Sequence, residues 1–184
     1  MMAEHENDNA TLLGLTGELR NRIYRLVVIE DSHAHGTVTV RCSELNEPAL
    51  LYANKQIRDG ALSIFYAKNI FLLDHVDFNS YVQFKWQSKQ SKLETQLKIR
   101  VRHHIKVTGQ PSWPDLINWL GRVYLGVVAA PSARTFEERS ALYRVTMAEM
   151  FESASRMRYL SWNKVVVRIA LSRRILIALN PAWK

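Results

Sequence analysis

The sequence predicts an α+β fold in which a small antiparallel sheet packs with several helices. Apolar residues recur at helical spacing in several segments, whereas residues 97–107 alternate strictly in side-chain character, as in a strand with one buried face. Helical and strand segments follow one another without a regular strand–helix–strand alternation, which favours α+β over α/β. A strand with one apolar and one polar face is typical of antiparallel sheets.

The composition indicates one folded domain after a short tail. The chain has 184 residues, of which 47% are hydrophobic and 10% aromatic, enough to bury a core. Residues 1–11 are predicted to be a disordered tail, and residues 12–184 a single domain. Cys42 is the sole cysteine, and the sequence shows neither a signal peptide nor a run of about 18 apolar residues. These features predict an intracellular protein, cytoplasmic or nuclear, without a membrane partner.

The first half of the chain is predicted to hold two helices and two strands. Thr16 is a candidate N-cap for a helix over 17–28, whose apolar residues recur at helical spacing. The β-branched residues of 36–42 alternate and predict a strand. Pro48 begins a second helix, which extends to residue 66, and a short apolar strand follows over 69–74.

The second half is predicted to hold four helices and the clearest strand of the chain. The strand covers 97–107, and the helices cover roughly 75–90, 115–126, 135–157 and 163–179. The last helix is expected to stop at Asn180-Pro181, because proline cannot continue a helix.

A search for catalytic and metal-binding patterns predicts no enzyme activity, no metal and no cofactor. The sequence contains neither a glycine-rich phosphate loop nor a nucleophile elbow. His33, His35 and Cys42 could form a nucleophile pair or three metal ligands, but a fourth ligand and a recognised spacing are missing. His103 and His104 are adjacent, so on a strand they point to opposite faces.

The strand over 97–107 also carries the most concentrated positive charge of a chain whose formal net charge is +8. Its even positions are Lys98, Arg100, Arg102, His104 and Lys106. Neighbouring cations on one strand face stand about 6.6–6.8 Å apart, so the row could follow a phosphate backbone or an acidic protein. The alternative is a solvent-facing strand that uses cations against edge aggregation. Both interpretations remain open.

Two segments resemble the F-box-like domains of filamentous fungi. They are Leu13-Gly-Leu-Thr-Gly-Glu-Leu-Arg-Asn-Arg-Ile-Tyr-Arg-Leu26 and Pro48-Ala-Leu-Leu-Tyr-Ala-Asn-Lys-Gln-Ile-Arg-Asp-Gly-Ala-Leu-Ser-Ile-Phe-Tyr-Ala-Lys-Asn-Ile-Phe71. That family reads Leu-Pro-x-Glu-Leu-Arg-Asn-x-Ile-Tyr, then Pro-Ala-Leu-Leu-x-x-Asn-x-Gln-Ile-Arg-x-Glu-Ala and Phe-Tyr-x-x-Asn-x-Phe. Thr16 stands where the pattern has proline, and Gly60 stands where it has glutamate. The resemblance covers residues 12–73 and implies a fungal source.

The resemblance implies a substrate adaptor for a cullin–RING ubiquitin ligase. In F-box proteins the first helix docks into a Skp-type adaptor, and the remainder presents a substrate. Here the partner-binding role would fall on Leu15, Leu19, Ile23 and Val27, whose four-residue spacing aligns them along one helix face. The alternative is that these side chains pack on the chain's own helix over 49–65.

The leading prediction is therefore a non-enzymatic protein-interaction module. The alternative function is a basic module that binds nucleic acid or an acidic protein partner. The substrate and the oligomeric state stay open at this point.

Overall fold

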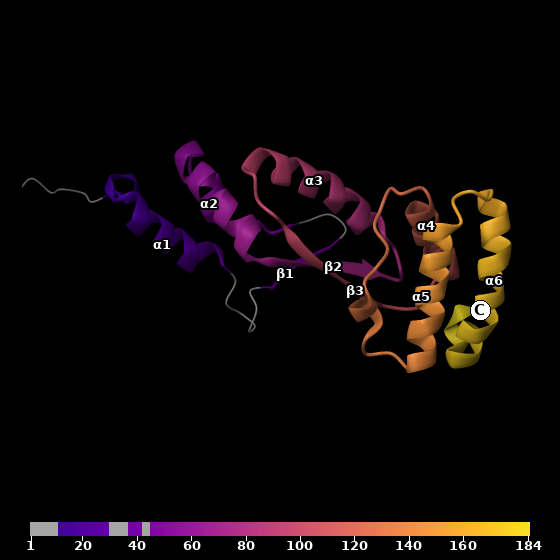
Figure 1. The fold of residues 1–184 in the computed structure, drawn as a ribbon. Coiled ribbons are helices and arrows are strands. Elements are labelled where there is room, and N and C mark those ends of the chain that lie inside the picture. Colours follow the sequence, from indigo (N-terminus) through magenta and orange to yellow (C-terminus); the bar gives the residue numbers. More distant parts are fainter. Residues whose placement is uncertain (1–10, 30–36, 42–44) are drawn as a thin grey trace, which may run out of the picture.

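The computed structural model describes residues 11–29, 37–41 and 45–184. The described part forms six α-helices, a three-stranded sheet and four short 3₁₀ helices (Figure 1). In chain order these are η1 (Leu12–Gly14), α1 (Gly17–Val28), β1 (Thr37–Val40), η2 (Ala49–Tyr52), α2 (Lys55–Lys68), β2 (Ile70–Val76), α3 (Tyr81–Leu97), β3 (Arg102–Thr108), α4 (Trp113–Tyr124), η3 (Ala133–Phe136), α5 (Ala141–Arg156), α6 (Trp162–Leu179) and η4 (Pro181–Trp183).

The sheet is parallel, so the α+β prediction is right and the antiparallel prediction is wrong. β2 lies between β1 and β3, and both pairings are parallel, with Val38 opposite Phe71 and Phe71 opposite His103. A helix crosses over between each pair of successive strands, α2 in the first connection and α3 in the second. Each crossover returns the chain to the end of the sheet at which the preceding strand began, so the next strand runs parallel to it.

One face of this sheet is covered by helices. The other, hereafter the open face, is uncovered except where η3 contacts β3. Phe71 and Leu73 of β2 are buried, and the Phe71 ring lies 4.7 Å from the ring of Trp86 on α3. On the opposite face Thr39 and Arg102 are exposed. A half-covered parallel sheet shows the same alternation as an antiparallel one, and this explains why the strand pattern misled the prediction.

The helix predicted over 17–28 is confirmed, and Thr16 caps it by accepting a hydrogen bond from the Leu19 amide at 3.5 Å. The single helix predicted from Pro48 to residue 66 is divided instead into η2 and α2. The side chain of Asn54 accepts a hydrogen bond from the Ile57 amide at 2.9 Å, so it caps a new helix.

The strand predicted over 97–107 begins five residues later, at Arg102. α3 extends to Leu97, and Lys98 closes it with a left-handed backbone conformation at φ 51°. Of the predicted tail, residues 1–10 lie outside the described residues. Thr11 belongs to the fold, because its hydroxyl accepts a hydrogen bond from the Gly14 amide at 3.3 Å.

The buried side chains form two clusters. The first lies between α1, α2, α3 and the sheet, and the second lies between α4, α5, α6 and η4. The clusters meet at Trp119, whose ring lies 4.5 Å from the ring of His75 and whose Nε1 donates to Gln83 Oε1 at 3.0 Å. Figure 1 shows the result as an elongated molecule with α1 at one end and α6 at the other.

Within the described residues, the structure contains no helix with the length and apolar character needed to cross a membrane.

Candidate functional site

α1 is fixed to the molecule along one side only. Tyr24 and Val28 are its buried residues, and they face α2 and the first cluster. The approach at Tyr24 is close, because a Cβ atom at Gly60 of α2 would lie 2.8 Å from Tyr24 Cε2. Asn69 donates from Nδ2 to the carbonyl oxygen of Val28 at 2.8 Å and secures the end of the helix.

The four residues predicted to bind a partner are hereafter called the N-terminal stripe. Leu19, Ile23 and Val27 lie on α1, outside its buried pair, whereas Leu15 precedes the helix in an extended conformation. Leu19 and Val27 are 48% and 53% exposed, and Leu15 and Ile23 are half-buried. Leu26 beside them is also exposed. α1 therefore packs on α2 through Tyr24 and Val28, and the N-terminal stripe retains apolar surface that a partner could contact.

The four cations predicted to form a basic face are all exposed: Lys98, Arg100, Arg102 and Lys106. Arg102 and Lys106 lie on β3 and point to the open face of the sheet with His104, whereas Lys98 and Arg100 precede the strand. Arg102 donates from Nη2 to the carbonyl oxygen of Lys68 at 3.0 Å, which orders one member of the row. Between the cations, the side chain of Val101 is buried.

His103 and His104 lie on opposite faces of β3, as predicted for adjacent residues of a strand. His103 is half-buried, and its pKa is lowered by burial and by the neighbouring His104. No group of three or more histidine, cysteine, aspartate or glutamate residues among the described residues could hold a metal ion. His33, His35 and Cys42 lie outside those residues.

Glu47 is the centre of a polar cluster that links three helical segments. Its carboxylate accepts hydrogen bonds from Tyr66 Oη at 2.5 Å, Tyr52 Oη at 3.0 Å and Lys89 Nζ at 2.7 Å. Burial raises the pKa of this carboxyl, but the hydrogen bonds from Lys89 and Tyr66 outweigh burial and hold the pKa below its ordinary value. Glu47 thus stays charged and joins η2, α2 and α3 rather than serving as a general acid.

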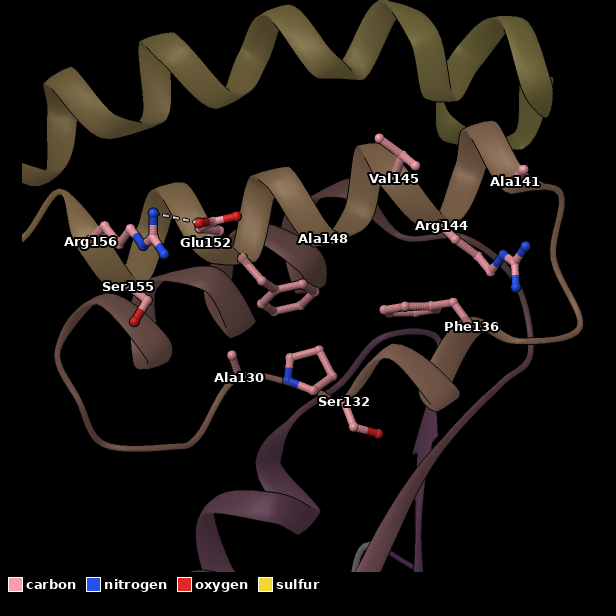
Figure 2. A pocket seen from close by; sticks show the side chains of 12 residues that line it. Ala130, Ser132, Phe136, Ala141, Arg144, Val145, Ala148, Glu152, Ser155 and Arg156 are labelled. Atoms are coloured by element: carbon pink, nitrogen blue, oxygen red, sulfur yellow. Dashed lines mark ion pairs between the residues drawn. The ribbon is translucent and has the colours of Figure 1, made fainter.

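A groove that the sequence did not predict runs along α5 (Figure 2). It encloses about 600 Å³ between α5 and the segment that contains Ala130 and Ser132. The rings of Phe136 and Phe151 lie at its base, stacked with centroids 6.4 Å apart, and Phe151 packs edge-on against Trp119 at 4.7 Å.

The charged groups of this groove are suited to binding rather than to acid–base chemistry. Arg144 and Arg156 lie at its two ends (Figure 2), and Arg156 Nη1 is paired with Glu152 Oε1 at 2.7 Å. Arg144, Arg156 and Glu152 are its titratable groups among the described lining residues. No local pattern could reveal this groove, because its walls come from segments that only tertiary packing brings together.

Comparisons of this chain with protein-family models, curated proteins and solved structures found no match.

Proposed function

We propose that the chain is a non-enzymatic protein-interaction module that docks a partner through the N-terminal stripe. The observation that carries this proposal is the exposure of Leu19 and Val27 on a helix whose other side is fixed by Tyr24. Leu19 and Val27 lie about two turns apart on this helix with the half-buried Ile23 between them, along one side, as in helices that enter a hydrophobic groove. Because it is already folded and anchored, little conformational entropy is lost on binding.

The partner proposed from the resemblance is a Skp-type adaptor of a cullin–RING ubiquitin ligase. This assignment rests on the match of residues 12–73 to the F-box-like pattern, whereas the docking role of α1 rests on its geometry. The two parts of the proposal can therefore fail separately.

A second candidate function is binding of nucleic acid or an acidic protein by the basic row. The observation that favours it is the exposure of Arg102, His104 and Lys106 along one side of β3. Asp74 lies on the same face, but it is already engaged by Arg41 Nε at 3.3 Å and by Thr108 Oγ1 at 2.6 Å.

The docking proposal is tested by replacing Leu19 and Val27 with aspartate and titrating the variant against a purified Skp-type adaptor by calorimetry. Placing two charges in an apolar interface should weaken binding by about 100-fold, or about tenfold per residue. The matched control is Leu125→Asp with Val127→Asp, because both residues are exposed, lie outside α1 and pair the same residue types. The control variant should bind like the unmodified chain.

A double variant of Leu19 and Val27 that binds as tightly as the unmodified chain would contradict docking through α1. If the unmodified chain does not bind the adaptor, the partner assignment is wrong. Affinity capture from the native cell is then carried out with the Leu19 and Val27 variant and with the control variant. A different partner is indicated by a protein that the control captures and the Leu19 and Val27 variant does not.

A further inference from the structure

α6 carries a second exposed apolar stripe, at the opposite end of the molecule from α1 (Figure 1). The helix packs against the rest of the protein through Val165, Ile169 and Leu176, which are buried. Its outer side presents one large apolar residue per turn: Val167 at 71% exposure, Leu171 at 68%, Ile175 at 41% and Leu179 at 38%. We call these four residues the α6 stripe.

The charges around the α6 stripe are mostly positive. Lys164, Arg168 and Arg174 are exposed, and residues 153–184 contain no aspartate or glutamate. With about 3.6 residues per turn, Arg168 and Arg174 fall on opposite sides of Leu171. Two acids face this region from α5, Glu149 and Glu152, which line a groove with Arg168 and Leu171. Glu152 is paired with Arg156, so the balance stays positive.

The shape and charge of the α6 stripe favour one class of occupant. From Val167 to Leu179 the helix rises about 18 Å, the length of a partner helix of about three turns. A spacing of four residues forms a narrow seam, as in helix–helix contacts. Helices that lie in a membrane interface instead present a wide apolar face with Trp or Phe, and the α6 stripe has no aromatic residue. Pairing with α6 of a second copy would place cations against cations.

We propose that the α6 stripe is a docking surface for an acidic amphipathic helix of a protein partner. The partner helix contributes apolar side chains to the seam and carboxylates beside Arg168 and Arg174. This surface is separate from the N-terminal stripe, so the protein has two docking ends that can be occupied at once. The inference does not depend on the identity of the partner of α1.

The test uses the full chain and a labelled helical peptide of about 18 residues, with leucine at every fourth position and glutamate flanking the leucines. Fluorescence anisotropy should detect binding that weakens as salt rises. Leu171→Asp with Ile175→Asp should reduce the affinity at least about tenfold, and so should Arg168→Glu with Arg174→Glu. Leu125→Asp with Val127→Asp, at two exposed residues outside the α6 stripe, should leave it unchanged.

A peptide with lysine in place of each glutamate should not bind. The proposal is overturned if the acidic peptide does not bind, or if its binding survives the changes at Leu171 and Ile175. It is also overturned if the chain binds anionic phosphatidylserine vesicles through these residues more tightly than it binds the peptide. Sedimentation that shows a dimer broken by the changes at Leu171 and Ile175 would assign the stripe to a second copy of the chain instead.

Discussion

At the scale of single residues, Gly60 sets how closely α1 can approach α2. Replacing a glycine inside a helix with alanine normally stabilises the helix by about 1 kcal/mol. Here the added Cβ would lie 2.8 Å from Tyr24 Cε2, so the ring that anchors α1 would have to move. We expect Gly60→Ala to lower the free energy of unfolding by about 1–2 kcal/mol, as overpacking does, in urea titrations.

The matched control for Gly60 is the same change in a Tyr24→Leu background, where the ring is absent. In that background Gly60→Ala should recover the stabilising effect of alanine in a helix. If Gly60→Ala stabilises the unmodified chain to the same extent, the close approach at Tyr24 does not constrain α1.

A second residue-scale prediction concerns the stability of the protein in acid. Burial lowers the pKa of His75 to about 3, the neighbouring Asp74 raises it, and Arg122 lowers it. Neither ring nitrogen of His75 has a hydrogen-bond partner among the described residues. The unfolded chain therefore takes up a proton at this histidine near the ordinary histidine pKa of 6.5, whereas the folded chain stays neutral to about 3.

The lowered pKa of His75 destabilises the folded protein as the pH falls. Above pH 6.5 the histidine is neutral in both states and has no effect. Between pH 6.5 and about 3 it is protonated only in the unfolded state, which lowers the free energy of the unfolded state relative to the folded state. The midpoint of thermal unfolding should fall less steeply over this range for His75→Phe, which keeps a ring against Trp119. His104→Phe, at an exposed histidine, should behave like the unmodified chain. Parallel pH profiles for all three proteins would show that His75 does not titrate as described.

At the scale of secondary-structure elements, the sequence predicts features that depend on residues close together in the chain, such as the bounds of a helix. The helix over 17–28 has the predicted bounds because Thr16 caps it and its apolar residues follow the helical period. The relative direction of the strands depends instead on the connections between them. The parallel pairing of β2 and β3 follows from the α3 crossover, whereas the alternation of 97–107 reports only that one face is covered.

The same limit applies to the candidate sites. The spacing of Leu19, Ile23 and Val27 predicts a stripe, but its exposure depends on Tyr24 being the residue that packs against Gly60. The groove at Phe136 and Phe151 depends entirely on how η3 packs beside α5, and no spacing in the sequence encodes that contact.

The basic row on and before β3 gives an element-scale prediction. If it binds nucleic acid, the affinity for a labelled single-stranded oligonucleotide should fall steeply as salt rises, because counterions are released on binding. Changing Arg100, Arg102 and Lys106 to alanine should abolish binding without loss of stability, since exposed charges stabilise little. The matched control removes three other exposed cations, Lys55, Lys85 and Lys92, which lie outside the proposed docking surfaces. If the chain does not bind the oligonucleotide at about 50 mM salt, the nucleic-acid proposal is wrong, and the basic row serves only to prevent aggregation at the edge strand β3.

At the scale of the whole molecule, the two clusters of buried residues separate the two docking ends. α1 and α6 lie at opposite ends of the molecule (Figure 1). α1 packs on the first cluster and α6 on the second, and Trp119 joins the clusters through His75 and Gln83. Partners bound at the two ends would therefore not compete for one surface. If both docking proposals hold, one molecule can bind two partners at once.

The most direct test of the central claim is hydrogen–deuterium exchange of the full chain with and without the purified Skp-type adaptor. If the N-terminal stripe docks the partner, added protection should appear in peptides covering Gly17–Val28, because docking suppresses local opening of α1. Peptides covering Arg102–Thr108 and Trp162–Leu179 should exchange at unchanged rates. Protection that spares α1 and appears at β3 or α6 would contradict the claim.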